Sequence, residues 1–239
     1  MVPLLQRLVR CALHPVKGFQ ERAVESPGLG VSFSWLILLR GSFSTISGLL
    51  MLHAVYRDYP MFKNANSPMW QEILRRLPSD INGFNAEDIQ AFVSSLPNLP
   101  SWASIWPWML LLGPVGIASA WLHNAVWDHT CLWILGGLKG KGGWRITFIA
   151  ESEAMQVGVL GAAFALLSFI PLAGPLLAPF FMLSSAYFWV MRGFALAAFH
   201  QAPMWKGAVA TVLHVLLATL CICGMLAACW LIVMQSVAM

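Results

Sequence analysis

The chain has 239 residues and a formal net charge of +4, and its composition is 59% hydrophobic and only 10% charged. Because soluble domains carry roughly 25% charged residues, this composition excludes an ordinary soluble protein and indicates one embedded in a membrane. The basic residues are scattered over short segments, so no nucleic-acid partner is expected. The length leaves room for one membrane bundle and one modest loop domain.

Residues 1–30 are predicted to form a cytosolic amphipathic segment that lies on the membrane surface. Its apolar residues recur at helical spacing: Leu4, Leu5, Leu8, Ala12 and Val16, with Phe19 near the same face. Three basic residues are placed to meet anionic lipid headgroups: Arg7, Arg10 and Lys17. The pair His14-Pro15 predicts a break in the helix, because the residue before a proline is disfavoured in the α region.

Five apolar stretches are predicted to cross the bilayer, over residues 31–55, 108–133, 154–171, 175–199 and 208–235. A hydrocarbon core of about 30 Å requires about 20 apolar residues in a helix, and all but the third stretch meet that length comfortably. The third is borderline, and reaches the length only if residues 150–153 enter the interface. The sequence therefore predicts an all-α protein, a polytopic membrane bundle with five transmembrane helices.

Residues 56–107, between the first two predicted spans, are expected to form a helical extracytoplasmic loop. The pair Ser67-Pro68 offers an N-cap and a proline at the first helical position, which predicts a helix over residues 69–77. A second helix is predicted over residues 89–96. This loop has two interpretations: a small helical cap on the bundle or membrane, and a lid that meets a partner or ligand.

The distribution of positive charge orients the chain. Eight Lys and Arg residues fall on one predicted side, in residues 1–30, in a Gly/Lys loop and helix over 134–153, and in a short loop over 200–207. Four fall in residues 56–107. Because Lys and Arg are enriched in cytoplasmic loops, the N-terminus is predicted to be cytosolic and the C-terminus extracytoplasmic. The expected location is a bacterial inner membrane.

Ionisable residues inside or at the mouths of the predicted spans are candidates for function, because each costs a few kcal/mol in a bilayer. The candidates are Arg40, Asp128, His129, Glu151, Glu153 and Arg192. Their depths predict that Arg192 pairs with Asp128, and that Arg40 meets Glu151, Glu153 or backbone carbonyls. Two interpretations stay open: internal pairs that fix helix packing, and a polar cavity, open to the cytosol, that binds an anion or a lipid headgroup.

Three basic residues in the second cytosolic segment complete the predicted headgroup contacts: Lys139, Lys141 and Arg145. Neither a catalytic group nor a metal site nor a cofactor is predicted. His123 and His129 are six residues apart, which is about 240° around a helix, so they face different ways. His214 is interpreted as a hydrogen-bonded packing residue, and the five cysteines as small apolar packing residues.

Three places in the chain resemble the Yip domain family, a group of five-span membrane proteins. The first is the segment Leu8–Phe19, with His14-Pro15 and Gly18-Phe19. The second is His129, followed by Gly136-Gly137 and the Lys/Gly run up to Trp144. The third consists of Pro171–Gly174, Phe199-His200 and Trp205–Ala208. The family has a Tyr and a Pro where the third span begins, and this chain has Ala150–Met155 there.

The resemblance implies a membrane-traffic role with small GTPase partners in eukaryotic relatives, and no settled activity in bacterial ones. This chain, which is short, looks like the bacterial type. We therefore expect a non-enzymatic membrane organiser or adaptor that acts through helix and lipid contacts. Its expected partners are anionic membrane lipids and a membrane-protein partner or a second copy of the chain. The alternative is a small transporter or lipid-handling protein that uses Arg40, Arg192 and Asp128.

Overall fold

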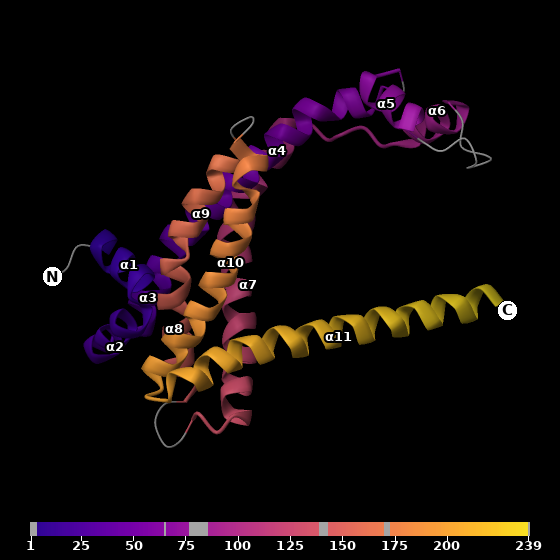
Figure 1. Ribbon diagram of the computed structural model, residues 1–239. Coiled ribbons are helices and arrows are strands. Elements are labelled where there is room, and N and C mark those ends of the chain that lie inside the picture. Colours follow the sequence, from indigo (N-terminus) through magenta and orange to yellow (C-terminus); the bar gives the residue numbers. More distant parts are fainter. Residues whose placement is uncertain (1–3, 65, 77–85, 139–142, 170–172, 239) are drawn as a thin grey trace. The chain divides into compact units, whose positions relative to one another are not determined.

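The computed structural model describes residues 4–64, 66–76, 86–138, 143–169 and 173–238 (Figure 1). Every described element is a helix, which confirms the all-α prediction. The chain separates into two compact units. Unit 1 comprises residues 1–44 and 114–239, and unit 2 comprises residues 45–113.

Among the described residues, four helices are long and apolar enough to cross a membrane, which confirms that the chain has the character of a multi-pass membrane protein. They are Leu29–Phe62, Trp102–Ile134, Met182–Phe199 and Met204–Gln235. These four correspond to the first, second, fourth and fifth predicted spans. The third predicted span is divided into shorter helices, and its last residues lie outside the described part of the chain.

The N-terminal segment forms a helical hairpin made of α1 (Leu4–Leu13) and α2 (Pro15–Glu25). The break falls at His14, as the sequence predicts, and α2 ends at Ser26 in the left-handed conformation. The buried face agrees with the predicted one at Leu8 and Phe19, but it also includes Cys11 and leaves out Leu5, which is 65% exposed. The reason is that this hairpin packs on other helices of unit 1, so its inward face is set by α8 and α10.

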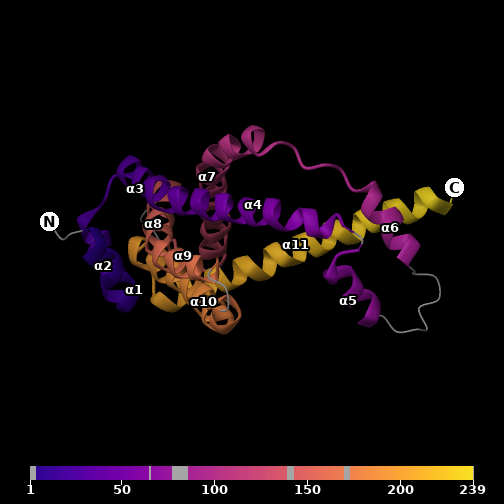
Figure 2. The same cartoon turned by 90° about the horizontal axis from the view of Figure 1, so that it is seen from above.

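The first long helix of the chain is continuous but not uniform. It begins as α3 (Leu29–Leu36), passes through the π-helical turn η1 (Ile37–Gly41) and continues as α4 (Ser42–Phe62). A π-turn inserts one residue into the helical ladder, and such turns are frequent at functional sites. Arg40 lies inside this turn. In unit 1, α3 packs against α8 (Trp144–Val157) (Figure 2).

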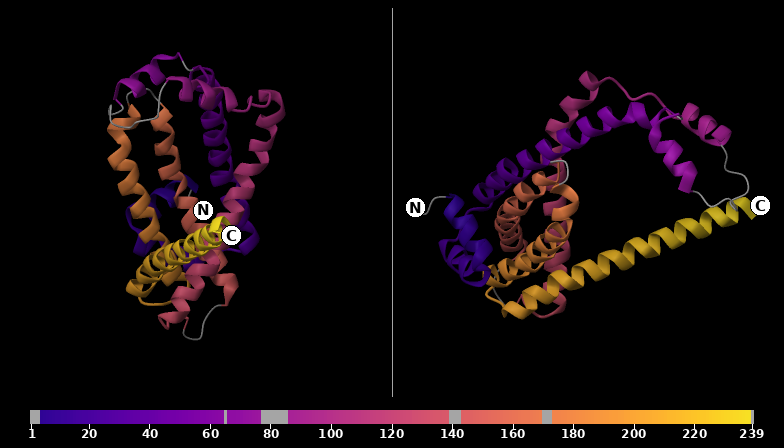
Figure 3. Two further views of the ribbon diagram at one scale, coloured as in Figure 1. Left: turned by 90° about the vertical axis from the view of Figure 1, so that its right-hand side faces the viewer. Right: turned by 45° about the horizontal axis from the view of Figure 1, so that its top comes forward.

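Helix α7 (Trp102–Ile134) begins six residues before the predicted span and ends at the turn around Gly136, whose φ is +62°. The third predicted span becomes α8, then α9 (Val159–Ala165) and the 3-10 turn η2 (Leu166–Phe169). These three pack along α10 (Ala173–Phe199), and the two columns run side by side in Figure 3. The third and fourth predicted stretches are therefore neighbours in unit 1; residues 170–172 between them lie outside the described residues.

Helix α11 (Met204–Ala238) crosses α10 in direct backbone contact. A Cβ atom on Gly207 would lie 2.0 Å from the carbonyl oxygen of Gly193, and one on Gly193 would lie 2.5 Å from the carbonyl oxygen of Gly207. Small residues allow this approach in membrane helices. The two glycines therefore set where α11 begins relative to α10.

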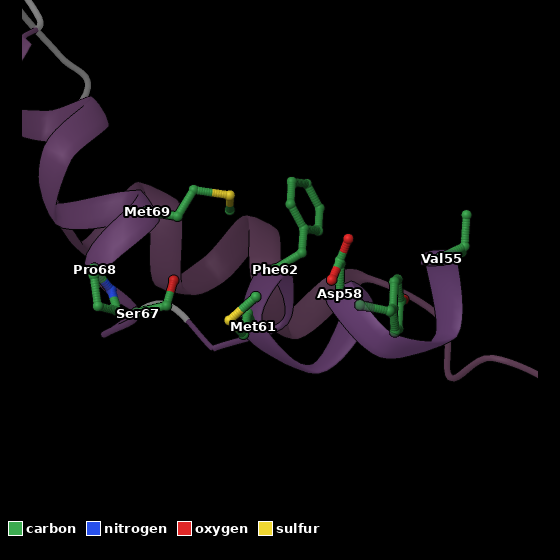
Figure 4. A pocket seen from close by; sticks show the side chains of 8 residues that line it. Val55, Asp58, Met61, Phe62, Ser67, Pro68 and Met69 are labelled. Atoms are coloured by element: carbon green, nitrogen blue, oxygen red, sulfur yellow. The ribbon is translucent and has the colours of Figure 1, made fainter. Parts of the chain in front are cut away.

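Unit 2 holds the predicted loop helices, α5 (Pro68–Arg76) and α6 (Ala86–Ser95). Their interior is aromatic: Trp70 and Val93 are buried against Phe62, and the Trp70 indole N–H donates to the Phe62 carbonyl oxygen at 2.8 Å. A pocket of about 460 Å³ opens beside them, where α4 meets α5 (Figure 4). It is lined by Val55, Asp58, Tyr59, Met61, Phe62, Ser67, Pro68 and Met69.

Candidate functional site: a buried ionic network

Arg192 holds two carboxylates in the interior of unit 1. Its Nη2 donates to Asp128 Oδ2 at 2.5 Å, and its Nε donates to Glu151 Oε2 at 3.0 Å. Asp128 and Glu151 have no exposed surface, and Arg192 is 6% exposed. The predicted pair of Arg192 and Asp128 is therefore confirmed. Glu151 belongs to the same cluster, and so it is Arg192, rather than Arg40, that binds this carboxylate.

Two histidines extend the cluster. His214 Nδ1 lies 2.6 Å from Asp128 Oδ1, and His214 Nε2 lies 3.3 Å from His123 Nε2. The His214 ring is stacked on Trp127, with an interplanar angle of 7°, and Trp189 meets it edge-on. His214 is thus a hydrogen-bonded packing residue, as predicted, but it also joins α11 to the ionic cluster.

The helix crossing at the two glycines explains how these side chains meet. Gly193 follows Arg192 directly on α10. His214 is seven residues after Gly207, two helical turns, so both lie on the same face of α11. This face of α11 contacts α10 at Gly193. His214 therefore lies on the side of α11 that faces Arg192 and its two carboxylate partners. The indole of Trp189 covers the guanidinium, with its ring centre 4.4 Å from Arg192 Cζ.

The charges of the cluster do not balance when all its ionisable groups take their usual forms. Two carboxylates face one guanidinium, and a neutral histidine adds no charge. Glu151 Oε1 is buried and has no hydrogen-bond partner. A buried oxygen that bears charge and lacks a partner is strongly disfavoured. The cluster therefore has room for one additional positive charge at Glu151.

Glu153 belongs to a second network, which fastens the N-terminal hairpin. Arg22 Nε donates to Glu153 Oε2 at 2.7 Å, and Ser32 Oγ donates to Glu153 Oε1 at 2.6 Å. Arg7 Nη2 donates to Gln156 Oε1 at 2.9 Å. Burial lowers the pKa of Arg22, but its hydrogen bond and charge interaction with Glu153 raise that pKa by more, to above its ordinary value. Glu153 is thus paired with Arg22. It is not the partner of Arg40, although the sequence left that pairing open.

Arg40 meets a backbone carbonyl, one of the three partners that the sequence left open. Its Nη1 donates to the carbonyl oxygen of Gly158 at 2.9 Å, at the junction between α8 and α9. Its Nε is buried and has no partner. Among the described residues, no carboxylate forms an ion pair with Arg40, and its guanidinium donates to the Gly158 carbonyl instead.

His129 lies in a third polar chain and not beside Arg192. Its Nδ1 is 2.7 Å from Thr147 Oγ1, and the same hydroxyl lies 2.8 Å from His200 Nε2. Trp144 is stacked on the His129 ring at 4.0 Å between centroids. This chain ties the end of α7 to the start of α8 and the end of α10.

The predicted headgroup residues fall into different surroundings. Arg7 points inward to Gln156, and Arg10 pairs with Glu21 at 2.5 Å on the surface. Lys17 and Arg145 are exposed. Lys139 and Lys141 lie outside the described residues. On the buried face of the hairpin, burial raises the pKa of the Cys11 thiol to about 11, which fits its interpretation as a packing residue.

Several residues of these networks were not singled out from the sequence. Thr147, Gln156 and Ser32 are polar residues near or within apolar stretches, and nothing in their spacing distinguishes them from surface positions. Arg22 is one of the eight basic residues on the predicted cytosolic side, and its position in the sequence does not indicate an ion pair. One signal in the sequence indicates these networks: the run of polar residues in α8. A helix with that composition is unsuited to face lipid, and it is suited to be surrounded by protein.

Comparison with protein-family models, with curated proteins and with solved structures finds no match for this chain. The resemblance to the Yip domain family therefore stays a prediction.

Proposed function

We propose that the chain crosses the membrane five times, with α8, α9 and η2 together forming the third crossing. This proposal is supported by the positions of two helix ends in unit 1. The Lys206 ammonium donates to the Gly136 carbonyl oxygen at 3.1 Å, so the end of α7 and the start of α11 lie at the same end of this unit. Between these points the chain must travel away and return. The outward limb is α8 to η2, and the returning limb is α10.

The proposed third crossing is long enough but unusually polar. It runs 26 residues from Trp144 to Phe169, which is roughly 39 Å at 1.5 Å per residue. Five polar side chains of α8 are buried: Thr147, Glu151, Ser152, Glu153 and Gln156. Each meets a partner in another helix or in its own, so lipid need not contact them. On this topology the N-terminus is cytosolic and the C-terminus extracytoplasmic.

We propose that the protein is a non-enzymatic membrane organiser, which presents its N-terminal hairpin and neighbouring basic residues to anionic lipids at the cytosolic surface. The observation that carries this proposal is the ion pair between Arg22 and Glu153, because it joins the hairpin to the most buried helix of the bundle. Such a hairpin is held at a fixed place and angle. A partner protein or a second copy of the chain would then be recruited beside it in the membrane.

The outer face of the hairpin has the composition expected of a surface-bound helix. Leu5, Leu13 and Val24 are 65%, 68% and 84% exposed. Lys17 lies on the same hairpin, and Arg145 is the second residue of α8, just after the Gly/Lys loop in sequence; both are exposed. Apolar residues that enter the headgroup region beside cationic side chains are the pattern that binds anionic leaflets. We propose a bacterial inner membrane as the location.

The proposal predicts selective retention of anionic lipid. The full chain is placed in nanodiscs of phosphatidylglycerol or phosphatidylcholine, released, and weighed with its bound lipids and proteins by native mass spectrometry. The double variant Lys17→Gln, Arg145→Gln is expected to bind phosphatidylglycerol about 30-fold more weakly, because each surface cation contributes about 1 kcal/mol to anionic-lipid attraction. The matched control removes the same charge from unit 2, Arg57→Gln with Lys63→Gln, and is expected to bind normally.

Equal retention by both double variants would contradict the organiser proposal. The same spectra record whether a second copy or another protein stays bound, which the proposal expects. The alternative function, a transporter or lipid-handling protein, is favoured by one observation: among the described residues, no carboxylate pairs with Arg40. One tightly held anionic lipid that is lost in Arg40→Leu, with the cytosolic variants unaffected, would favour that alternative.

A further inference from the structure

The buried cluster around Arg192 is joined to an exposed histidine by an unbroken line of titratable groups. The line runs from His123 to His214, from His214 to Asp128, and from Asp128 to Glu151. The first two contacts are hydrogen-bond distances of 3.3 Å and 2.6 Å. In the third, the carboxyl groups of Asp128 and Glu151 are close enough for one to hydrogen bond the other when a proton lies between them.

We propose that Glu151 is a proton-binding site, and that its proton is exchanged along the line of Asp128, His214 and His123. The first reason is the charge of the cluster. With Glu151 protonated, Asp128 and Arg192 cancel, and the buried group is neutral. With Glu151 ionised, one negative charge remains without a partner in a setting that does not solvate it. The orphaned Oε1 atom is where the hydrogen is placed.

The second reason is that each member of the line both accepts and donates a proton. In one arrangement of tautomers, His214 donates from Nδ1 to Asp128 and accepts at Nε2 from His123. A proton that binds His123 at Nδ1 releases the Nε2 proton to His214. His214 in turn passes its Nδ1 proton to Asp128, and Asp128 passes a proton to Glu151. One proton has then moved from the exposed ring to the buried carboxylate, and nothing is oxidised or reduced. Chains of Asp, Glu and His are the usual proton relays inside membrane proteins.

The surroundings hold the line in place. Trp127 and Trp189 pack on the His214 ring, so the ring stays oriented toward Asp128. The charged or titratable groups that face the two carboxylates are Arg192 from α10, His214 from α11 and, beside Asp128 on α7, the buried Cys131. Arg192 binds one oxygen of each carboxylate, which leaves Glu151 Oε1 and Asp128 Oδ1 for the proton and for His214. The ligand inferred is a proton and not a metal ion, because Arg192 and His214 already occupy three of the four carboxylate oxygens, and no group of three or more His, Cys, Asp or Glu among the described residues could hold a metal ion.

The test is infrared difference spectroscopy on the full chain in lipid nanodiscs, which detects the C=O stretch of protonated carboxyl groups. The wild-type protein is expected to show one such band at neutral pH. The band is expected to be lost in Glu151→Gln and also in Asp128→Asn, in which Glu151 pairs alone with Arg192. It is expected to persist in Asp58→Asn, a variant of an exposed ion pair in unit 2. The Asp128→Asn variant keeps the test decisive if Glu151→Gln does not fold.

The relay is tested by the rate at which that band shifts after transfer to deuterium oxide. The variant His123→Gln is expected to retain the band and to exchange at least 10-fold more slowly, while His53→Gln, a histidine of unit 2, exchanges at the normal rate. Absence of the band in the wild-type protein at neutral pH, or its persistence in Glu151→Gln, would overturn the proton site. Stabilisation of the cluster by sodium ions, with no such band, would also overturn the proton site. Unchanged exchange in His123→Gln would overturn the relay.

Discussion

Replacement of Arg192 by Met is expected to destabilise the protein by about 3–5 kcal/mol, because it leaves buried carboxylate charge without its guanidinium. Asp128 and Glu151 both depend on this side chain, and neither has exposed surface. The free energy of unfolding, measured in detergent by tryptophan fluorescence during a denaturant titration, is the quantity to compare. We expect the variant to unfold at a much lower denaturant concentration than the wild-type protein.

Two further variants separate the loss of charge pairing from the loss of packing. In the triple variant Asp128→Leu, Glu151→Met, Arg192→Met the charges are removed together, and most of the lost stability should return, since a buried ionic triad replaced by well-packed hydrophobic residues of similar volume is often no less stable. Arg57→Met removes an exposed arginine from its pair with Asp58 and should leave the titration unchanged. If Arg192→Met unfolds at the same denaturant concentration as the wild-type protein, the ionic cluster does not stabilise the bundle.

Replacement of Gly207 by Ala is expected to reduce the free energy of unfolding by about 1–3 kcal/mol, the usual cost of overpacking. The new methyl group would meet the carbonyl oxygen of Gly193 at 2.0 Å and the Ala197 side chain at 2.7 Å. A backbone atom cannot turn aside as a flexible side chain can, so the two helices must separate. Separation would also move His214 away from Asp128.

Gly224, on the same helix, provides the matched control. Nothing lies within 4 Å of a Cβ atom added there. Because Ala is favoured over Gly in a helix by about 1 kcal/mol, Gly224→Ala should be neutral or stabilising. The expected results therefore differ in sign for one chemical change at two positions of α11. Equal stabilisation by both substitutions would show that α10 and α11 do not meet in backbone contact.

The parts of the fold that depend on local pattern were predictable. The hairpin break at His14-Pro15, the helix that begins at Pro68 and the long apolar helices each follow from residues close in sequence. The pairing of Arg192 with Asp128 was also predictable, because few partners exist at that depth in a bilayer. The chain therefore reveals its class and its strongest ionic contact without any tertiary information.

The remaining contacts depend on which helix faces are turned toward each other, and periodicity does not determine that. Glu151 and Glu153 are two residues apart and point in different directions, one to Arg192 and the other to Arg22. Arg22 lies in a segment that the sequence assigned to the membrane surface. His214 is one polar residue in a long apolar helix, and its role follows only from the close approach of Gly193 and Gly207.

The side of the membrane on which the C-terminus lies tests most directly whether the polar column of α8, α9 and η2 crosses the bilayer. Five crossings place the two termini on opposite sides, whereas the four apolar helices alone would place them on the same side. In a bacterial host, alkaline phosphatase fused after Met239 is then expected to be active, and green fluorescent protein fused there to be dark, while the same fluorescent protein before Met1 is bright. Bright fluorescence from fusions at both termini would contradict the third crossing.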